Sequence, residues 1–149
     1  MGTRWDMFRG RFEHTIDDKG RLSIPAKFRE ALGKEKRVVL VGTDAYLSVL
    51  PMKAWRGIED RLKSGPTFRK DIRDFLRNVY SSAEDAEIDP QGRVLISQAL
   101  RQKARIVRDV VLIGAMDLIE IWDKPQWEAQ AASATPAMDS MARLGELGV

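Results

Sequence analysis

The pattern Asp-x-x-Gly-Arg occurs twice in the sequence, as Asp17–Arg21 and as Asp89–Arg93. In both copies an arginine follows a glycine that can form a tight turn, so its side chain is presented beside a reversal of the chain. The planar guanidinium group can grip a phosphate, or the O6 and N7 atoms of guanine, with two hydrogen bonds. Arg21 and Arg93 are therefore our first candidates for contacting a polyanion such as DNA.

The other residues of the two patterns suit the shaping of a turn. Asp17 and Asp89 can accept hydrogen bonds from backbone N–H groups within the turn. Gly20 and Gly92 can take positive φ without steric cost. The spacing leaves a second interpretation of Arg21 open, namely a purely local salt bridge with Asp17. The two interpretations are compatible, because Asp17 could hold Arg21 in the geometry that presents it.

Three further cations lie close to the first turn in the sequence. Lys19 is in the turn itself and can add a phosphate contact, while Arg9 and Arg11 lie in the extended segment that enters it. Binding DNA needs cations that reach phosphates as well as groups that reach base edges. Since Gln91 takes the place of Lys19 in the second turn, we expect the first turn to dominate binding.

Composition argues against enzymes and metal proteins. There is no cysteine, so disulfides, thiolate nucleophiles and zinc-thiolate sites are excluded. The single histidine, His14, lies in an expected strand and suits a structural or surface role. The sequence contains no phosphate-binding glycine loop and no nucleophile elbow. We therefore expect no catalytic residue, no metal, no cofactor and no small-molecule substrate.

The formal net charge of +3 is modest but unevenly distributed. Basic residues outnumber acidic ones over residues 1–37, and acidic ones predominate from Asp117 onward. Such asymmetry suggests that one face meets a polyanion, although charged residues that merely solvate a small protein would look similar. No apolar run approaches the roughly 18 residues of a membrane span. Since the first residues form no apolar run, we expect no signal peptide. We expect a cytoplasmic protein without membrane contact.

An internal repeat determines how these residues are positioned. At an offset of 72 residues, Asp17 matches Asp89, Arg29 matches Arg101 and Trp55 matches Trp127. Each copy predicts an extended segment, the turn, a short strand, a short helix, a buried strand and a returning strand. The helices are expected over 26–32 and 98–104, and the buried strands over 38–41 and 110–113. Gly42 and Gly114 are expected to end the buried strands.

The repeat divides the chain into four predicted parts. Residues 11–54 and 83–126 are the two β-β-α-β-β repeats, and a helix lies between them within 63–82. Apolar residues recur there at helical spacing, so this helix is either a solvated linker or faces DNA or another subunit. Residues 129–149, rich in Ala, Ser, Met and Gly, are predicted to form a frayed helix or mobile tail.

The opening of the chain resembles the MraZ family. The resemblance is carried by Met7–Gly10, by Glu13 and His14, and by the long string Asp17–Arg29; the second element, Asp89–Arg93, and Trp122 also fit. It covers roughly residues 7–127 and leaves residues 1–6 as an extension relative to the family.

The resemblance implies a mixed α/β, β-rich fold related to AbrB. Two tandem, pseudo-symmetric repeats would interlock into one swapped-hairpin barrel with flanking helices. It also implies a sequence-specific DNA-binding transcriptional regulator, expected to be a nucleoid-associated repressor. Such regulators bind direct repeats in double-stranded DNA upstream of the division and cell-wall gene cluster, as ring-shaped homo-oligomers. The alternative is a protein-interaction module of the antitoxin type, which uses the same kind of fold.

Overall fold

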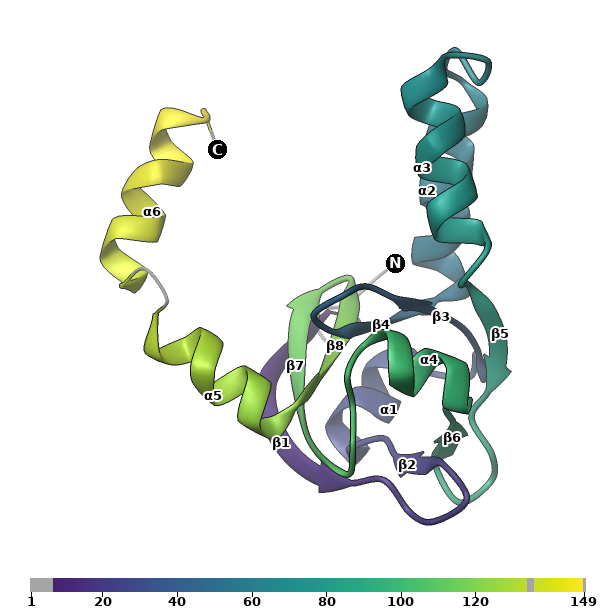
Figure 1. Ribbon diagram of the computed structural model, residues 1–149, viewed down its shortest axis with the longest axis vertical. Coiled ribbons are helices and arrows are strands. Elements are labelled where there is room, and N and C mark those ends of the chain that lie inside the picture. Colours follow the sequence, from purple (N-terminus) through teal and green to yellow (C-terminus); the bar gives the residue numbers. More distant parts are fainter. Residues whose placement is uncertain (1–6, 134–135, 149) are drawn as a thin grey trace.

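The computed structural model describes residues 7–133 and 136–148. The predicted extension, residues 1–6, lies outside these ranges. The fold is mixed α/β and rich in strands, as predicted (Figure 1). The strands are β1 (Phe8–Thr15), β2 (Arg21–Ser23), β3 (Arg37–Gly42), β4 (Leu47–Pro51), β5 (Glu84–Glu87), β6 (Arg93–Leu95), β7 (Asp109–Met116) and β8 (Leu118–Asp123). The helices are α1 (Ala26–Leu32), α2 (Met52–Lys63), α3 (Lys70–Tyr80), α4 (Gln98–Lys103), α5 (Lys124–Ala132) and α6 (Ala137–Glu146).

Strands of both repeats contribute to each sheet. The larger sheet has the order β1-β7-β8-β4-β3-β5, and β2 pairs with β6 in a second, two-stranded sheet. All of these pairings are antiparallel. The first strand of each repeat therefore pairs with the third strand of the other, β1 with β7 and β5 with β3.

The strand registers show that the repeats are related by a local two-fold axis. In the centre of the large sheet Ser48 pairs with Glu120, and in the small sheet Leu22 pairs with Val94. Each pair joins residues that are equivalent at the repeat offset. An antiparallel pair of equivalent residues must lie on the two-fold axis, so the axis passes through both sheets.

Both repeats contribute to one hydrophobic core. Phe28 from α1 and its equivalent Leu100 from α4 are fully buried beside apolar residues of the strands. Pro25 precedes α1, where its missing N–H group leaves no helical donor unpaired. Ser97 caps α4, because its side chain accepts a hydrogen bond from the Leu100 N–H at 3.2 Å. Local sequence signals thus start both helices, and burial holds them against the sheets.

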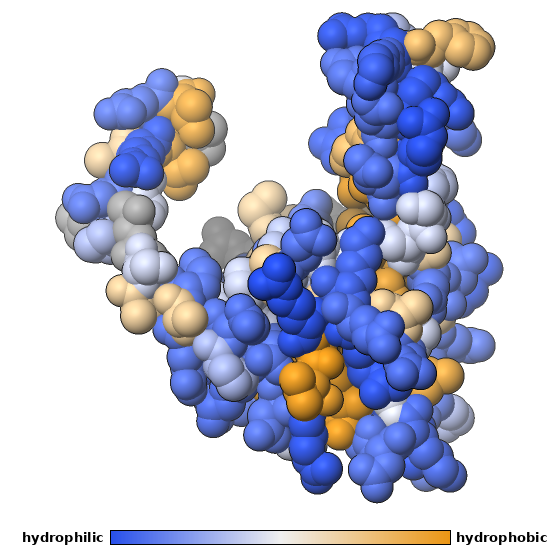
Figure 2. Space-filling model, in the orientation of Figure 1, coloured by the Kyte–Doolittle hydropathy of each residue, from blue (hydrophilic) through white to orange (hydrophobic). Residues whose placement is uncertain are grey.

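Helices α2 and α3 form a hairpin that projects from one end of the sheets, and α5 and α6 lead away on the other side (Figure 1). Trp55 of α2 is buried, with its ring centroid 5.3 Å from that of Tyr80 in α3. Trp127 of α5 is partly buried and packs edge-on against Trp122. The described side chains of α6 are exposed, and apolar ones gather on one side of the helix (Figure 2).

Two expectations differ from the structure. Among the described residues the strands form open sheets and no closed barrel, because β2 and β6 pair with each other about the two-fold axis and do not join the larger sheet. Gly114 does not end its strand, since β7 continues to Met116. A Cβ atom at Gly114 would overlap the backbone of Arg9 in β1, so the glycine permits close strand contact.

No helix in the part of the chain that the structure describes is long and apolar enough to cross a membrane.

Candidate nucleic-acid interface

The first turn is organised by one carboxylate. Asp17 Oδ1 accepts hydrogen bonds from the backbone N–H groups of Lys19 and Arg21, both at 2.9 Å. Asp17 Oδ2 accepts a third from Arg21 Nε at 2.7 Å. The local salt bridge anticipated from the spacing therefore forms, and it leaves both Nη nitrogens of Arg21 without a hydrogen bond among the described residues.

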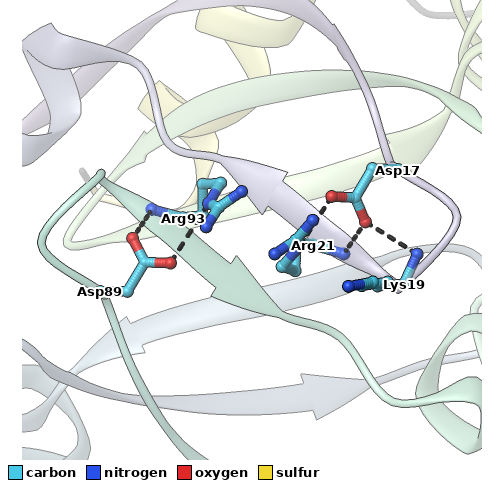
Figure 3. A network of polar contacts seen from close by, with 5 residues as sticks. All are labelled: Asp17, Lys19, Arg21, Asp89 and Arg93. Carbon is cyan, nitrogen blue, oxygen red and sulfur yellow. Dashed lines mark hydrogen bonds and ion pairs between the residues drawn. The ribbon is translucent and has the colours of Figure 1, made fainter.

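The second turn repeats this arrangement with a looser ion pair (Figure 3). Asp89 Oδ1 accepts hydrogen bonds from the backbone N–H groups of Gln91 and Arg93, both at 2.9 Å. Arg93 Nε donates to Asp89 Oδ2 at 3.2 Å, compared with 2.7 Å in the first turn. Each arginine is thus held by the aspartate four residues before it, and the first is held more tightly.

Hydrogen bonding also keeps both carboxylates charged. The backbone N–H of Arg21 is the largest cause that lowers the pKa of Asp17 below its ordinary value of 3.8, and the Arg21 side chain adds to it. The backbone N–H of Arg93 does the same for the pKa of Asp89. Partial burial opposes the shift at both sites but is outweighed. Both turns therefore keep their ion pairs at any pH near neutrality.

The turn glycines are required by conformation and by space. Gly20 and Gly92 have φ angles of 84° and 80°. A Cβ atom at Gly20 would lie 2.8 Å from the carbonyl oxygen of Ile96, and one at Gly92 would lie 2.8 Å from an Nη atom of Arg29. Each turn is consequently pressed against residues of the other repeat, which makes its shape part of the packing between repeats.

The strands β2 and β6 bring the two turns together, and we call this antiparallel pair the ribbon. In its register Arg21 is opposite Leu95 and Ser23 is opposite Arg93. The middle pair, Leu22 and Val94, is buried in the core. Because side chains alternate along a strand, Arg21, Ser23, Arg93 and Leu95 share the outer face of the ribbon. The arginines are diagonal neighbours, and antiparallel pairing places the Cα atoms of such residues about 7–8 Å apart.

The sequence predicts the two turns and their arginines as candidates, but it does not predict the arginines that lie behind the turns. Arg29 Nε donates to the Ile24 carbonyl at 3.0 Å, and Arg101 Nε donates to the Ile96 carbonyl at 3.2 Å. Each guanidinium lies against the turn glycine of the other repeat. The repeat alignment, which matches Arg29 with Arg101, was the available signal, but it could not show that these side chains cross between repeats.

Two more cations flank the turns through backbone contacts. The carbonyl of Arg108 accepts a hydrogen bond from the Ile16 N–H at 2.9 Å, just before the first turn. The carbonyl of Lys36 accepts one from the Ile88 N–H at 2.8 Å, just before the second. These residues are equivalent at the repeat offset. A basic residue that is distant in sequence thus lies next to each turn, and the Arg108 guanidinium is 3.9 Å from the Asp18 carboxylate of the first turn.

The structure separates the other two predicted cations from the turns. Arg9 and Arg11 lie on β1, the edge strand of the large sheet. At roughly 3.3 Å per residue, Arg9 is about 20 Å along this strand from Thr15 at its far end. Arg11 donates to Glu13 at 2.9 Å, and Glu13 also contacts Lys124 at 3.5 Å. Neither residue belongs to the group that the ribbon gathers.

No group of three or more potential metal ligands occurs in the described ranges, 7–133 and 136–148. His14 lies on β1 opposite Val110, and burial lowers its pKa. The arrangement on the ribbon is instead suited to binding: two pre-positioned guanidinium groups on one exposed face, with further cations at either side.

Comparisons with known proteins show which family the sequence matches. Residues 7–78 and 79–145 each match the family model described as "MraZ protein, putative antitoxin-like". The chain is 45% identical over 136 residues to a "Transcriptional regulator MraZ" of Caldanaerobacter subterraneus subsp. tengcongensis, covering 91% of this chain and 94% of that protein. It is 40% identical over 144 residues to a protein of the same name from Acetivibrio thermocellus, covering 96% and 100%.

Proposed function

Because the chain belongs to the MraZ family of DNA-binding transcriptional regulators, which are not enzymes, we propose a specific DNA-binding surface for it. We propose that it contacts double-stranded DNA with the outer face of the ribbon. The observation that carries the proposal is the placement of Arg21 and Arg93. The two repeats bring them side by side on one exposed face, each held by an aspartate (Figure 3).

The tethered arginines suit bidentate recognition. Each uses Nε for its aspartate, and the two Nη nitrogens form a fork of the width that matches O6 and N7 of guanine or two phosphate oxygens. A two-stranded antiparallel ribbon also fits the major groove of B-form DNA. Arg21 and Arg93 are therefore proposed to enter one major groove and contact bases.

The surrounding cations are proposed to contact phosphates. Lys19 lies at the tip of the first turn, and Arg108 and Lys36 flank the two turns. Contacts of this kind fix the register and orientation of a protein on the duplex. Gln91 occupies the position of Lys19 in the second turn. The first turn should thus contribute more to affinity, and Arg9 and Arg11 should contribute only where DNA extends along β1.

We further propose that the protein acts as a ring-shaped homo-oligomer on direct repeats upstream of the division and cell-wall gene cluster, as a repressor. A few phosphate contacts per chain, at a log–log salt slope of about −0.9 each, give weak binding at physiological salt. Several linked subunits on repeated sites raise the effective concentration. Exposed apolar residues on α3 and α6, including Phe75 and Leu144, support subunit contacts. Sedimentation that shows only monomers together with tight specific binding would contradict this.

The exchange of strands between repeats supports an AbrB-like, swapped-hairpin classification, with residues 11–54 and 83–126 as the proposed repeats. A regulator of this kind acts on the chromosome. Nucleoid association in the cytoplasm is therefore part of the proposal.

Fluorescence anisotropy on a duplex from upstream of the protein's own gene tests the interface, with a shuffled duplex alongside at two salt concentrations. Loss of one bidentate contact, at about 1–3 kcal/mol, lowers specific affinity about five- to 160-fold. We expect this for Arg21→Ala and a smaller loss for Arg93→Ala. Lys63→Ala, which removes an exposed cation at the end of α2, is the control and should bind normally. Equally weak binding to both duplexes, indifferent to Arg21→Ala, would refute the proposal.

A second candidate function is an antitoxin-type interaction module. The matching family model carries the words "antitoxin-like", and the apolar side of α6 offers a surface for a protein partner (Figure 2). Removal of residues 134–149 distinguishes the two functions. A regulator that binds DNA with the ribbon should keep its contacts with each single DNA site after this truncation. An interaction module that uses α6 should lose its protein partner.

A further inference from the structure

The outer face of the ribbon is symmetric in its arginines but not in their neighbours. At the repeat offset, Arg21 is equivalent to Arg93, whereas Ser23 is equivalent to Leu95. The register places Leu95 directly opposite Arg21 and Ser23 directly opposite Arg93. One arginine thus has an apolar partner across the ribbon and the other a hydroxyl.

We propose that Leu95 is a specificity-determining residue that contacts the 5-methyl group of a thymine next to the base read by Arg21. The inference rests on the proposed function, since it requires the outer face of the ribbon to enter the major groove. The C5-methyl group of thymine is the one apolar group that a base pair presents there. A leucine on a surface that meets DNA has no comparable partner among phosphates.

The position of Leu95 favours recognition over packing. The Leu95 residue is 59% exposed, whereas its chain neighbours Val94 and Ile96 are fully buried. A single exposed leucine is ordinary on a protein surface. This one, however, lies directly opposite Arg21 and two residues from Arg93 on the same strand, and it shares their outer face. Its side chain contributes little to the core, so its replacement should leave the fold intact.

The asymmetry gives each binding unit a direction on DNA. A protein with two-fold symmetry reads a palindrome, because equivalent side chains meet equivalent bases. Here the two arginines can contact equivalent guanines, but the positions beside them differ. Leu95 selects a thymine methyl group, whereas the Ser23 hydroxyl can form hydrogen bonds with more than one kind of base. A unit of this kind has distinguishable ends, so several units in the same orientation would occupy repeats that run in one direction.

Removal of single methyl groups from the DNA tests the contact. Each thymine of the upstream duplex is replaced in turn by deoxyuridine, which lacks only the 5-methyl group, and affinity is measured by anisotropy. Burial of one methyl group corresponds to about a four-fold change in affinity. We expect one thymine at which the wild type loses about four-fold, and no loss at that thymine for Leu95→Ser. Phe68→Ser, which changes an exposed residue between α2 and α3, should behave as the wild type does.

The Leu95→Ser variant also makes the two sides of the ribbon alike. We expect it to discriminate less than the wild type between the native duplex and one in which half of the site is replaced by an inverted copy of the other half. Circular dichroism of the variant checks that the fold is retained.

The results separate this inference from the proposed interface. If Arg21→Ala abolishes specific binding but the wild type is insensitive to every methyl removal, the interface stands and the role of Leu95 is refuted. The same holds if Leu95→Ser loses as much as the wild type at the sensitive thymine. If Arg21→Ala binds normally, the interface itself is wrong and the role of Leu95 falls with it.

Discussion

Replacing Asp17 by asparagine isolates its role in positioning Arg21. The asparagine side chain would keep one carbonyl oxygen in the place of Oδ1, so the two backbone hydrogen bonds of the turn can persist. Its amide group would replace Oδ2 and present a donor to Arg21 Nε, which now donates to Asp17 at 2.7 Å. The substitution therefore removes the tether of the arginine while it preserves the turn.

The expected effect on stability is small and the effect on recognition is larger. Both side chains of the pair are about a third exposed, at 34% and 38%, so solvent screening limits the loss of unfolding free energy to less than about 1 kcal/mol. An untethered arginine must be immobilised on binding, at about 0.5–1.5 kcal/mol, which corresponds to roughly two- to twelve-fold weaker specific binding.

The assay must compare two duplexes, because the substitution also removes a negative charge. That change strengthens attraction to any duplex. We therefore predict a roughly two- to twelve-fold fall in the ratio of affinities for the upstream and the shuffled duplex, measured by anisotropy at one salt concentration. Asp89→Asn is the matched control and should lower the ratio less, since its tether is longer at 3.2 Å. An unchanged ratio for Asp17→Asn, where Arg21→Ala lowers it, would refute the positioning role.

Three further predictions concern stability and ionisation. Gly20→Ala should lower the free energy of unfolding by at least about 1–2 kcal/mol, since φ is 84° and the new Cβ would lie 2.8 Å from a carbonyl oxygen. Gly57→Ala, in open space on α2, should instead raise it by about 0.5–1 kcal/mol, and urea denaturation measures both changes. Burial lowers the pKa of His14 below 6.5, so the stability that the neutral imidazole contributes is present above pH 6.5 and is lost as the pH falls below 6.5. Urea midpoints measured on either side of pH 6.5 should therefore differ in the wild type but not in His14→Gln. Burial and the 2.7 Å hydrogen bond to Glu59 raise the pKa of Tyr80 to about 12, and Glu59→Gln should bring its absorbance titration closer to 10.0.

Each of these predictions has a result that would contradict it. Equal stability of the two glycine variants would mean that the turn tolerates a side chain. A pH dependence that persists in His14→Gln would assign it to other groups. An unchanged tyrosine titration in Glu59→Gln would leave burial as the whole cause.

The local elements of this protein could be read from its sequence because their signals are local. Helix α1 spans Ala26–Leu32 as predicted, since Pro25 marks its start and a glycine follows its end. The aspartates and glycines of the turns take the roles that their residue types suggested, because positive φ and short carboxylate hydrogen bonds depend on neighbours within four residues. The prediction for Gly114 is wrong, because this glycine permits contact with the distant strand β1 and does not end its own strand.

The candidate site could be predicted only in part. Arg21 and Arg93 were identified from the pattern that precedes them. Nearness in sequence predicts that Arg9 lies with them, yet the extended strand β1 carries it away from the turn. Arg29 and Arg101 were not identified, because their importance comes from lying against a glycine of the other repeat, a relation that no spacing within one repeat encodes.

The sequence by itself determined that the chain is a duplicated unit, that each unit contains a turn with an aspartate and an arginine, and that enzyme chemistry is absent from its motifs. The tertiary structure decided how the units combine. It paired β2 with β6 through equivalent residues, placed Arg21 diagonal to Arg93, and left the large sheet open. The physical reason is that these pairings arise from the shared burial of residues such as Leu22 and Val94. That burial joins positions 72 residues apart, so it has no signature in any local stretch of the chain.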